Sequence, residues 1–189
     1  MASKDVTISL EFTPNPNTLK FVVSQPFMER GAANFPNLQS ADKSPLAQAL
    51  YKVEGVTGVL IGTNFVTITK GAAGDWDVIA DQVPKTLETH FKNGTALFVE
   101  GFDPNAHKPS VGGSSAVETK IREVLDNEIR PAVAMDGGDI TFEKFEDGTV
   151  YLHLQGACSS CPSSIATLKI GVETRLKEVI PEIKEVVQV

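Results

Sequence analysis

The chain of 189 residues contains little cysteine, histidine and tryptophan, and the scarcity of cysteine is the most informative of the three. A disulfide-stabilised secreted domain spreads its cysteines along the sequence to close long loops. Here the only two cysteines, Cys158 and Cys161, are separated by two residues and close almost no loop. The sequence therefore favours a reducing compartment and predicts thiolate chemistry.

No hydrophobic run approaches the ~20 apolar residues that a membrane-spanning helix requires. Residues 1–5 lead directly into strand-like sequence, without the apolar core of a secretory signal or the Arg- and Ser-rich composition of a transit peptide. We therefore expect no membrane partner, and we expect that any targeting segment has already been removed.

Basic residues are also outnumbered, because the net charge is −7 at pH 7. Nucleic-acid-binding proteins usually present a basic face, so we expect no nucleic-acid partner. The chain has no Ser/His/Asp set, no phosphate-binding loop and no HExxH motif, so no sequence feature indicates hydrolase or nucleotide chemistry.

What the sequence does contain is the pattern of two small α+β domains. In residues 1–100, alternating apolar residues predict strands over 6–12, 19–23, 56–61, 65–69 and 95–99. The first two of these form a half-buried hairpin around the turn residues 13–17, whereas residues 24–44 have no regular pattern.

Two helices are predicted in the same domain. Ser44 and Pro45 are typical of the start of a short helix, and Asp75 is typical of the start of a longer one. Pro84 lies inside the longer pattern, where we expect it to kink or split the helix.

Residues 101–115 interrupt these patterns and end in a Gly/Ser run, which predicts a flexible linker. Residues 1–110 carry 9 basic and 11 acidic residues, whereas residues 111–189 carry 8 and 13. The negative charge is therefore concentrated in the cysteine-containing half.

Residues 116–189 are predicted to form the second α+β domain. Helical spacing predicts a helix over residues 117–129 that Pro131 ends or bends, followed by a tight turn at residues 136–139. Strands are expected over residues 140–145, where the alternation is imperfect, and 150–154. A second helix follows the cysteines, and Pro181 separates it from a closing strand over residues 183–189.

The cysteines lie between a predicted strand and a predicted helix. Pro162 suits the first position of that helix, so Cys161 is expected near its N-cap and Cys158 about one turn earlier. Free N–H groups and the positive end of the helix dipole lower the pKa of a thiol at such a position. Ser159 and Ser160 are expected to donate hydrogen bonds to the sulfurs.

Two thiolates complete neither a tetrahedral zinc site nor a cubane cluster, which needs one ligand for each iron. The three histidines, His90, His107 and His153, do not have ligand spacing to the cysteines, and His153 is interpreted as a partly exposed strand residue. The simplest completion is a second copy of the chain across a two-fold axis. Spacing alone leaves open a bridging cluster or zinc ion, a redox disulfide, and an inert pair of small residues.

Longer motifs narrow these alternatives. Residues 129–131, the Asp-Gly-Gly-Asp turn at 136–139 and the Gly-Ala-Cys-Ser-Ser-Cys-Pro-Ser-Ser run at 156–164 resemble the C-terminal domain of NifU, in the Nfu-type iron–sulfur carriers. Residues 13–21 and 58–68 resemble the Nfu N-terminal domain. One departure is Met135, which stands where relatives often carry a charged residue.

The resemblance implies a protein that is not an enzyme and that carries an iron–sulfur cluster to apo-proteins. Cys158 and Cys161 would be ligands of a 4Fe–4S cluster, or alternatively a 2Fe–2S cluster, shared between two chains of a homodimer. Recipient apo-proteins and an upstream assembly scaffold would be its partners, and the N-terminal domain would help to select them.

The expected location is the cytoplasm of a bacterium or, alternatively, the mitochondrial matrix after presequence removal. The rival hypothesis for the function is a thiol–disulfide oxidoreductase, which would also place a CxxC motif at the start of a helix.

Overall fold

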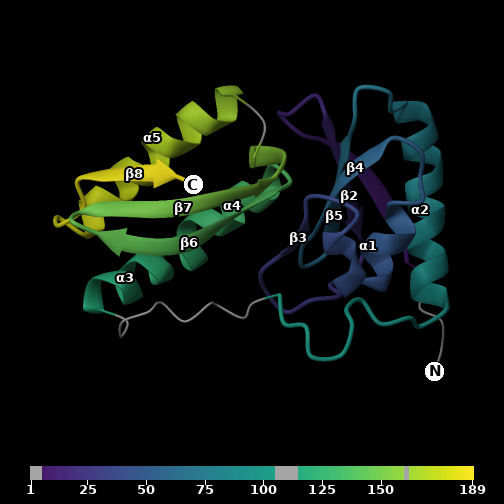
Figure 1. The fold of residues 1–189 in the computed structure, drawn as a ribbon, viewed down its shortest axis with the longest axis horizontal. Helices are drawn as coiled ribbons and strands as arrows, with labels where there is room; N and C mark the ends of the chain where they lie inside the picture. Colours follow the sequence, from purple (N-terminus) through teal and green to yellow (C-terminus); the bar gives the residue numbers. More distant parts are fainter. Residues whose placement is uncertain (1–5, 105–114, 160–161) are drawn as a thin grey trace. The chain divides into compact units, whose positions relative to one another are not determined.

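The computed structural model describes residues 6–104, 115–159 and 162–189. The chain divides into two compact units, Met1–Ala106 and His107–Val189, each with its own sheet and helices (Figure 1). Both units are α+β, which confirms the predicted fold class. The division lies inside the predicted linker, of which residues 105–114 are outside the described residues.

The first unit is a five-stranded antiparallel sheet covered on one face by two helices (Figure 1). The strand order is β1-β2-β5-β4-β3. Its elements are β1 (Ile8–Phe12), β2 (Thr18–Val23), β3 (Ala33–Phe35), η1 (Ser40–Lys43), α1 (Pro45–Leu50), β4 (Val56–Ile61), β5 (Phe65–Lys70) and α2 (Trp76–Lys92). Alternate residues of the strands and the inner faces of α1 and α2 form one apolar core.

Both helix starts follow the predicted capping chemistry. The Ser44 hydroxyl accepts a hydrogen bond from the Ala47 N–H at 3.1 Å, and the Asp75 carboxylate accepts one from the Asp77 N–H at 2.8 Å. Such caps satisfy N–H groups that have no partner within the helix.

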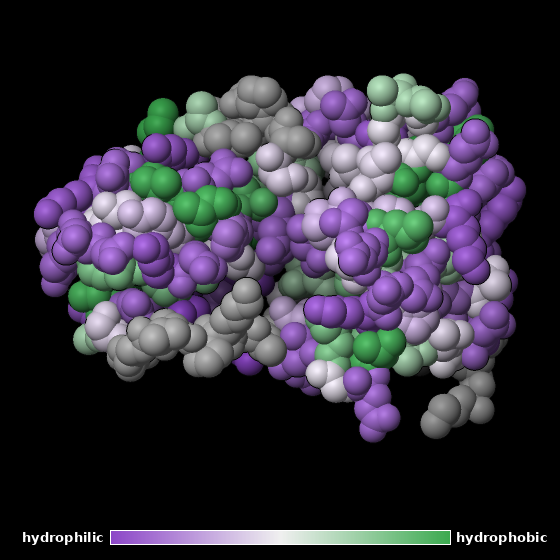
Figure 2. All heavy atoms as spheres, viewed as in Figure 1, coloured by the Kyte–Doolittle hydropathy of each residue, from purple (hydrophilic) through white to green (hydrophobic). Residues whose placement is uncertain are grey.

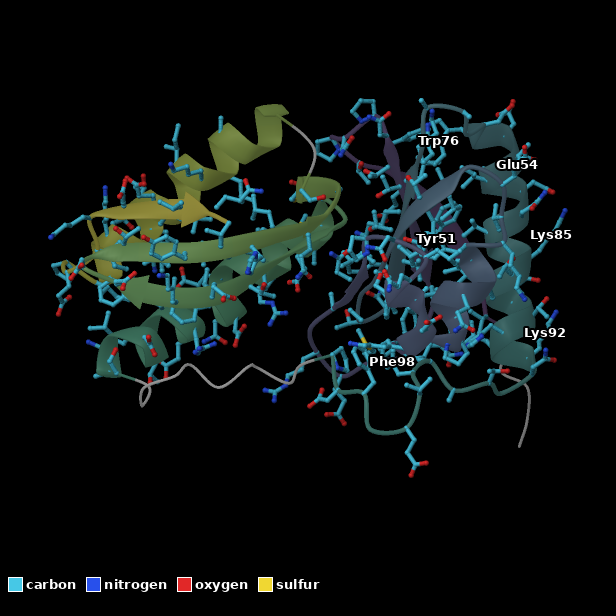
Figure 3. All side chains as sticks on the ribbon, in the orientation of Figure 1. Tyr51, Glu54, Trp76, Lys85, Lys92 and Phe98 are labelled. Atoms are coloured by element: carbon cyan, nitrogen blue, oxygen red, sulfur yellow. The ribbon has the colours of Figure 1, made fainter. Side chains whose placement is uncertain are left out.

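The longer helix, α2, has a clear inner and outer face. Ile79, Val83 and Leu87 are fully buried. Lys85 and Lys92 lie on the outer face and pair with acidic residues one turn earlier (Figure 3). α2 runs through Pro84 without a break, so the predicted split is wrong. Burial of the apolar residues on both sides of Pro84 offsets the hydrogen bond that proline cannot donate.

Three further predictions for the first unit need correction. Residues 95–99 do not form a strand. Instead, the Ser44 hydroxyl donates a hydrogen bond to the Leu97 carbonyl, and the Val99 N–H donates one to the Lys43 carbonyl. The short strand β3 was not signalled, because Ala-Asn-Phe is too short to display alternation. Finally, β1 is not half-buried, since all of its residues after Ile8 are exposed.

The second unit packs helices against a three-stranded sheet in the order β6-β7-β8. Strands β6 and β7 form a hairpin, whereas β8 is parallel to β7 and is reached through α5. Its elements are α3 (Ala116–Val124), η2 (Leu125–Ile129, a π-helical turn), α4 (Arg130–Met135), β6 (Gly138–Glu146), β7 (Thr149–Gly156), η3 (Ala157–Ser159), α5 (Pro162–Val179) and β8 (Glu185–Gln188). The core is apolar and draws on every helix and strand.

Pro131 does not end the first helical segment. A π-helical turn precedes it, and the chain then continues as α4 with Pro131 in the first turn of that helix. Proline is tolerated there because the N–H of a first-turn residue has no partner within a helix.

The imperfect alternation in β6 also has a structural cause. Phe142 pairs with Leu152, but Lys144 pairs with Tyr151, so Glu143 is an extra residue in a β-bulge. The bulge shifts the phase of the strand by one residue, which lets Phe145 join Phe142 against the core.

The surface drawn in Figure 2 is mostly hydrophilic, with apolar residues in small separate groups. Among the helices of the described residues, none is both long enough and apolar enough to cross a membrane.

The buried imidazole of His90 in α2 predicts a pH dependence of stability. His90 is 7% exposed, and its Nε2 atom has no hydrogen-bond partner within the described structure. Burial lowers the pKa of His90 below its ordinary value of 6.5, in spite of a hydrogen bond with the backbone of Thr95. The unfolded chain therefore takes up the proton first as the pH falls.

We predict that the free energy of unfolding of the first unit is constant above about pH 7 and falls below pH 6.5, with a slope no steeper than about 1.4 kcal/mol per pH unit. Urea unfolding followed by fluorescence of Trp76, the chain's single tryptophan, measures this unit. His90→Phe removes the slope, and the control His153→Gln in the other unit retains it. An unchanged slope in His90→Phe would contradict the assignment.

Candidate functional site: the cysteine loop

The cysteine loop connects β7 to α5 at one end of the second unit. β7 ends at Gly156, which has a positive φ of 62°, and the chain then forms the short 3₁₀ turn η3 that contains Cys158. α5 begins at Pro162, as the sequence predicts. Cys161 and Ser160 lie outside the described residues.

Hydrogen bonds hold the start of this loop in place. The Ala157 N–H donates to the Gly137 carbonyl at 3.2 Å, which ties the loop to the turn before β6. The Ser159 hydroxyl donates to the Gly156 carbonyl at 2.8 Å. Ser159 therefore closes the turn with its proton, and the predicted donation to a cysteine sulfur is wrong for this residue.

Cys158 is packed against the glycine that starts β6. The residue is 3% exposed and belongs to the apolar core of the second unit. Gly138 lies opposite Gly156 in the β6–β7 register, and a Cβ atom added to Gly138 would lie 2.5 Å from Cys158 Sγ and 3.1 Å from Cys158 Cβ. No ordinary side chain fits at position 138 while the sulfur keeps this position. The Asp-Gly-Gly-Asp segment is thus a platform for the cysteine as well as a turn.

A buried ion pair holds this platform in place. Arg130 Nε and Nη2 each donate to one carboxylate oxygen of Asp139 at 2.9 Å, and Nη1 donates to Asp126 at 2.9 Å. The side chain of Asp139 is 5% exposed and that of Arg130 is 18% exposed. Burial lowers the pKa of Arg130, but the hydrogen bonds and charges of Asp139 and Asp126 outweigh it and raise the pKa overall. The pair therefore joins the start of α4 to Asp139, the residue that follows Gly138 in β6.

The sequence alone does not identify Gly138 and Arg130 as parts of the site. The signal was present, because Arg130 and the Gly-Gly pair lie within the motifs that carry the family resemblance. Nothing in their spacing showed that they pack against Cys158 or pair with Asp139, since both contacts depend on the fold.

Of the three histidines, His153 is the one that the structure describes in the same unit as Cys158, and its ring bonds to other residues. His153 Nδ1 lies 2.7 Å from the Val189 carbonyl and Nε2 lies 3.1 Å from Glu143 Oε2. His90 belongs to the first unit, and His107 is outside the described residues. Within the described part of the chain, no three His, Cys, Asp or Glu side chains are grouped in a way that would hold a metal ion.

Comparisons with known proteins agree with this architecture. Residues 121–187 match the NifU-like domain, and residues 8–94 match the N-terminal domain of the scaffold protein Nfu/NifU. The two matches define a protein with an Nfu-type first domain and a NifU-like second domain.

Sequence matches to similar proteins extend over nearly the whole length of this chain. It is 42% identical over 183 residues to the human "NFU1 iron-sulfur cluster scaffold homolog, mitochondrial", covering 96% of this chain and 71% of that protein. It is 41% identical over 184 residues to "NifU-like protein 4, mitochondrial" of Arabidopsis thaliana, covering 96% and 65%. The chain belongs to the Nfu family of NifU-like proteins, and it spans about two thirds of the length of these relatives.

Among solved structures, the chain is similar to the solution NMR structure of a NifU-like protein from Saccharomyces cerevisiae. The identity is 24% and the TM-score is 0.45, over 53% of this chain and 91% of that one.

The close approach at Gly138 predicts the effect of one added methyl group. Gly138→Ala forces Cys158 out of its position, and we expect the second unit to lose about 1–3 kcal/mol of stability, as for other overpacked cores. We also expect faster reaction of the Cys158 thiol with a soluble disulfide reagent in a Cys161→Ser background.

Gly171→Ala is the matched control, because an added Cβ there meets no atom within 4 Å and lies in the helix α5. It should leave thiol reactivity unchanged and stabilise the unit by up to about 1 kcal/mol. If the two variants have the same stability in urea and the same rate of thiol reaction, the packing of Cys158 against Gly138 is contradicted.

The ion pair predicts a second effect on stability. Asp139→Asn leaves the largely buried charge of Arg130 with only Asp126, and we expect a loss of about 2–4 kcal/mol. Glu146→Gln breaks the exposed Lys144–Glu146 pair and should change stability by less than about 0.5 kcal/mol. Circular dichroism during urea unfolding measures both; similar losses would rule out a special role for the buried pair.

Proposed function

We propose that this protein is an iron–sulfur cluster carrier that holds a transient 4Fe–4S cluster as cargo and delivers it to apo-proteins. The observation that carries the proposal is the placement of Cys158 between the end of β7 and the Gly138 platform, in a chain of the Nfu family. Relatives named as iron–sulfur cluster scaffolds support the assembly role.

The number of cysteines determines how the cluster would be bound. A 4Fe–4S cluster takes four cysteine thiolates, and the chain has two, Cys158 and Cys161. A second copy related by a two-fold axis supplies the other pair, so the loaded form is a homodimer with the cluster between its subunits. A 2Fe–2S cluster shared in the same way uses the same four ligands and is the alternative cargo.

The residues around Cys158 suit a group that enters and leaves. Gly138 lies against the sulfur without a side chain, and Gly156 and Ala157, which precede Cys158 in the chain, also have little side-chain volume. Cys158 is 3% exposed in the single chain, so we expect its sulfur to become more accessible when a cluster binds. With two ligands on each subunit, a recipient that offers more thiolates is able to remove the cluster, which favours transport over storage.

The proposed location is the mitochondrion, because the relatives described above are named as mitochondrial proteins. The comparisons do not support the first expectation of a bacterial cytoplasm. The proposed partners are recipient apo-proteins and an upstream assembly scaffold, with the first unit helping to select them.

Anaerobic reconstitution of the full chain with iron and sulfide tests the proposal. We expect about two irons and two sulfides per chain in a dimer, which corresponds to one shared 4Fe–4S cluster. About one of each per chain in a dimer would indicate the 2Fe–2S form. Cys158→Ser and Cys161→Ser should each lose the cluster and the cluster-linked dimer while remaining folded, whereas His153→Ala should keep both.

Two results would overturn the proposal. The first is a single-cysteine variant that still binds a full cluster. The second is a wild-type chain that binds no iron but cycles reversibly between dithiol and disulfide, which would assign the protein to the thiol–disulfide oxidoreductases. A cluster-loaded dimer that does not activate an apo-protein would support cluster binding but contradict delivery of the cluster.

A further inference from the structure

The outer edge of β1 is an open strand edge with an apolar face. β1 ends the five-stranded sheet, and within the described residues no strand pairs with its outer side. Leu10 is 38% exposed and Phe12 is 87% exposed, on a strand that contains no proline. The opposite edge is better protected, because β3 has three residues and is followed by Pro36. Proteins usually cover or interrupt a strand edge of this kind.

The direction of the backbone groups follows from the pairing with β2. The Ser24 N–H donates to the Thr7 carbonyl at 2.9 Å, so Thr7 turns its backbone groups toward β2. These groups alternate in direction along an antiparallel strand. Ile8, Leu10 and Phe12 therefore turn their N–H and C=O groups outward, and the same three residues carry the apolar side chains on one face of the strand.

The sequence of β1 is complementary to itself. In an antiparallel pair centred on Leu10, Leu10 lies opposite the partner's Leu10 and Ile8 lies opposite the partner's Phe12. All three outward-facing residues meet outward-facing residues, and their side chains lie on a common face. Ser9 lies opposite the partner's Glu11, so the two carboxylates are not opposed. Glu11 is already paired with Lys20 of its own chain at 3.1 Å.

We propose that β1 pairs with β1 of a second copy of this chain, which joins the two first-unit sheets across a two-fold axis. Five residues on each side is far below the 20–30 residues of a standard interface, so the contact is weak by itself. It becomes effective when another link already holds two chains together, because the local concentration of the partner strand is then raised. This strengthening rests on the proposed cluster bridge, whereas the contact itself does not.

Charge substitutions at the symmetry axis test the contact without a cluster. In a full chain carrying Cys158→Ser and Cys161→Ser, sedimentation velocity at high protein concentration should detect weak self-association. Leu10→Lys and Leu10→Glu each place like charges opposite one another and should abolish it, whereas an equimolar mixture of the two should restore it. Leu38→Lys is the matched control, since Leu38 is 62% exposed in the same unit and lies outside the strands.

Amide hydrogen exchange tests the contact in the loaded dimer. The Leu10 amide should exchange at least about tenfold more slowly in the cluster-loaded wild type than in the cluster-free chain at low concentration. Trp76 fluorescence verifies that each variant is folded. If no cluster forms, the proposed function fails, but the cysteine-free experiment still decides the strand contact.

Three outcomes would overturn the proposal. Folded Leu10→Lys and Leu10→Glu chains that do not associate when mixed would exclude the antiparallel register. Equal Leu10 exchange in loaded and cluster-free chains would exclude the contact in the dimer. Protection that appears only when a recipient protein is added would assign the edge to a strand of that protein.

Discussion

The close contact between Gly138 and Cys158 sets the geometry of the second unit around its sulfur. This contact sets two conditions. β6 has to begin with a residue that lacks a side chain, and β6 has to be held in the position where that residue contacts Cys158. The ion pair between Arg130 and Asp139 provides the second condition. The pair joins α4 to β6. Because it is largely buried, removing either partner is expected to lower the stability of the unit. The π-helical turn η2 also helps to position Arg130. Arg130 directly follows this turn, and its side chain bonds to Asp126 within the turn.

The two units have different physical designs. The first has a core under two capped helices, no cysteine, and a sheet in which no described strand pairs with the outer edge of β1. The second is smaller, more acidic and organised around one loop. The two cores share no element, so a substitution in one core is expected to leave the packing of the other unchanged.

Much of this could be predicted from local sequence chemistry. Ser44, Asp75 and Pro162 begin helices because capping and the missing proline N–H act within a single turn. The Cys158 position followed from the same local rules. Contacts between distant segments were out of reach: the pairing of Arg130 with Asp139 and the packing of Gly138 depend on how β6 meets β7. The exposure of β1 was mispredicted for a related reason. Alternation shows that one face of a strand is apolar, but not whether a helix reaches far enough to cover it.

The parallel pairing of β8 with β7 has a consequence for the stretch of chain that lies between these two strands. β7 leads into the loop, α5 leads out of it, and β8 returns to pair with β7 from Thr149 to Leu152. The loop and α5 therefore form a closed circuit of chain whose two ends are joined by backbone hydrogen bonds. Fraying at the C-terminus therefore does not reach Cys158 until that strand pair separates.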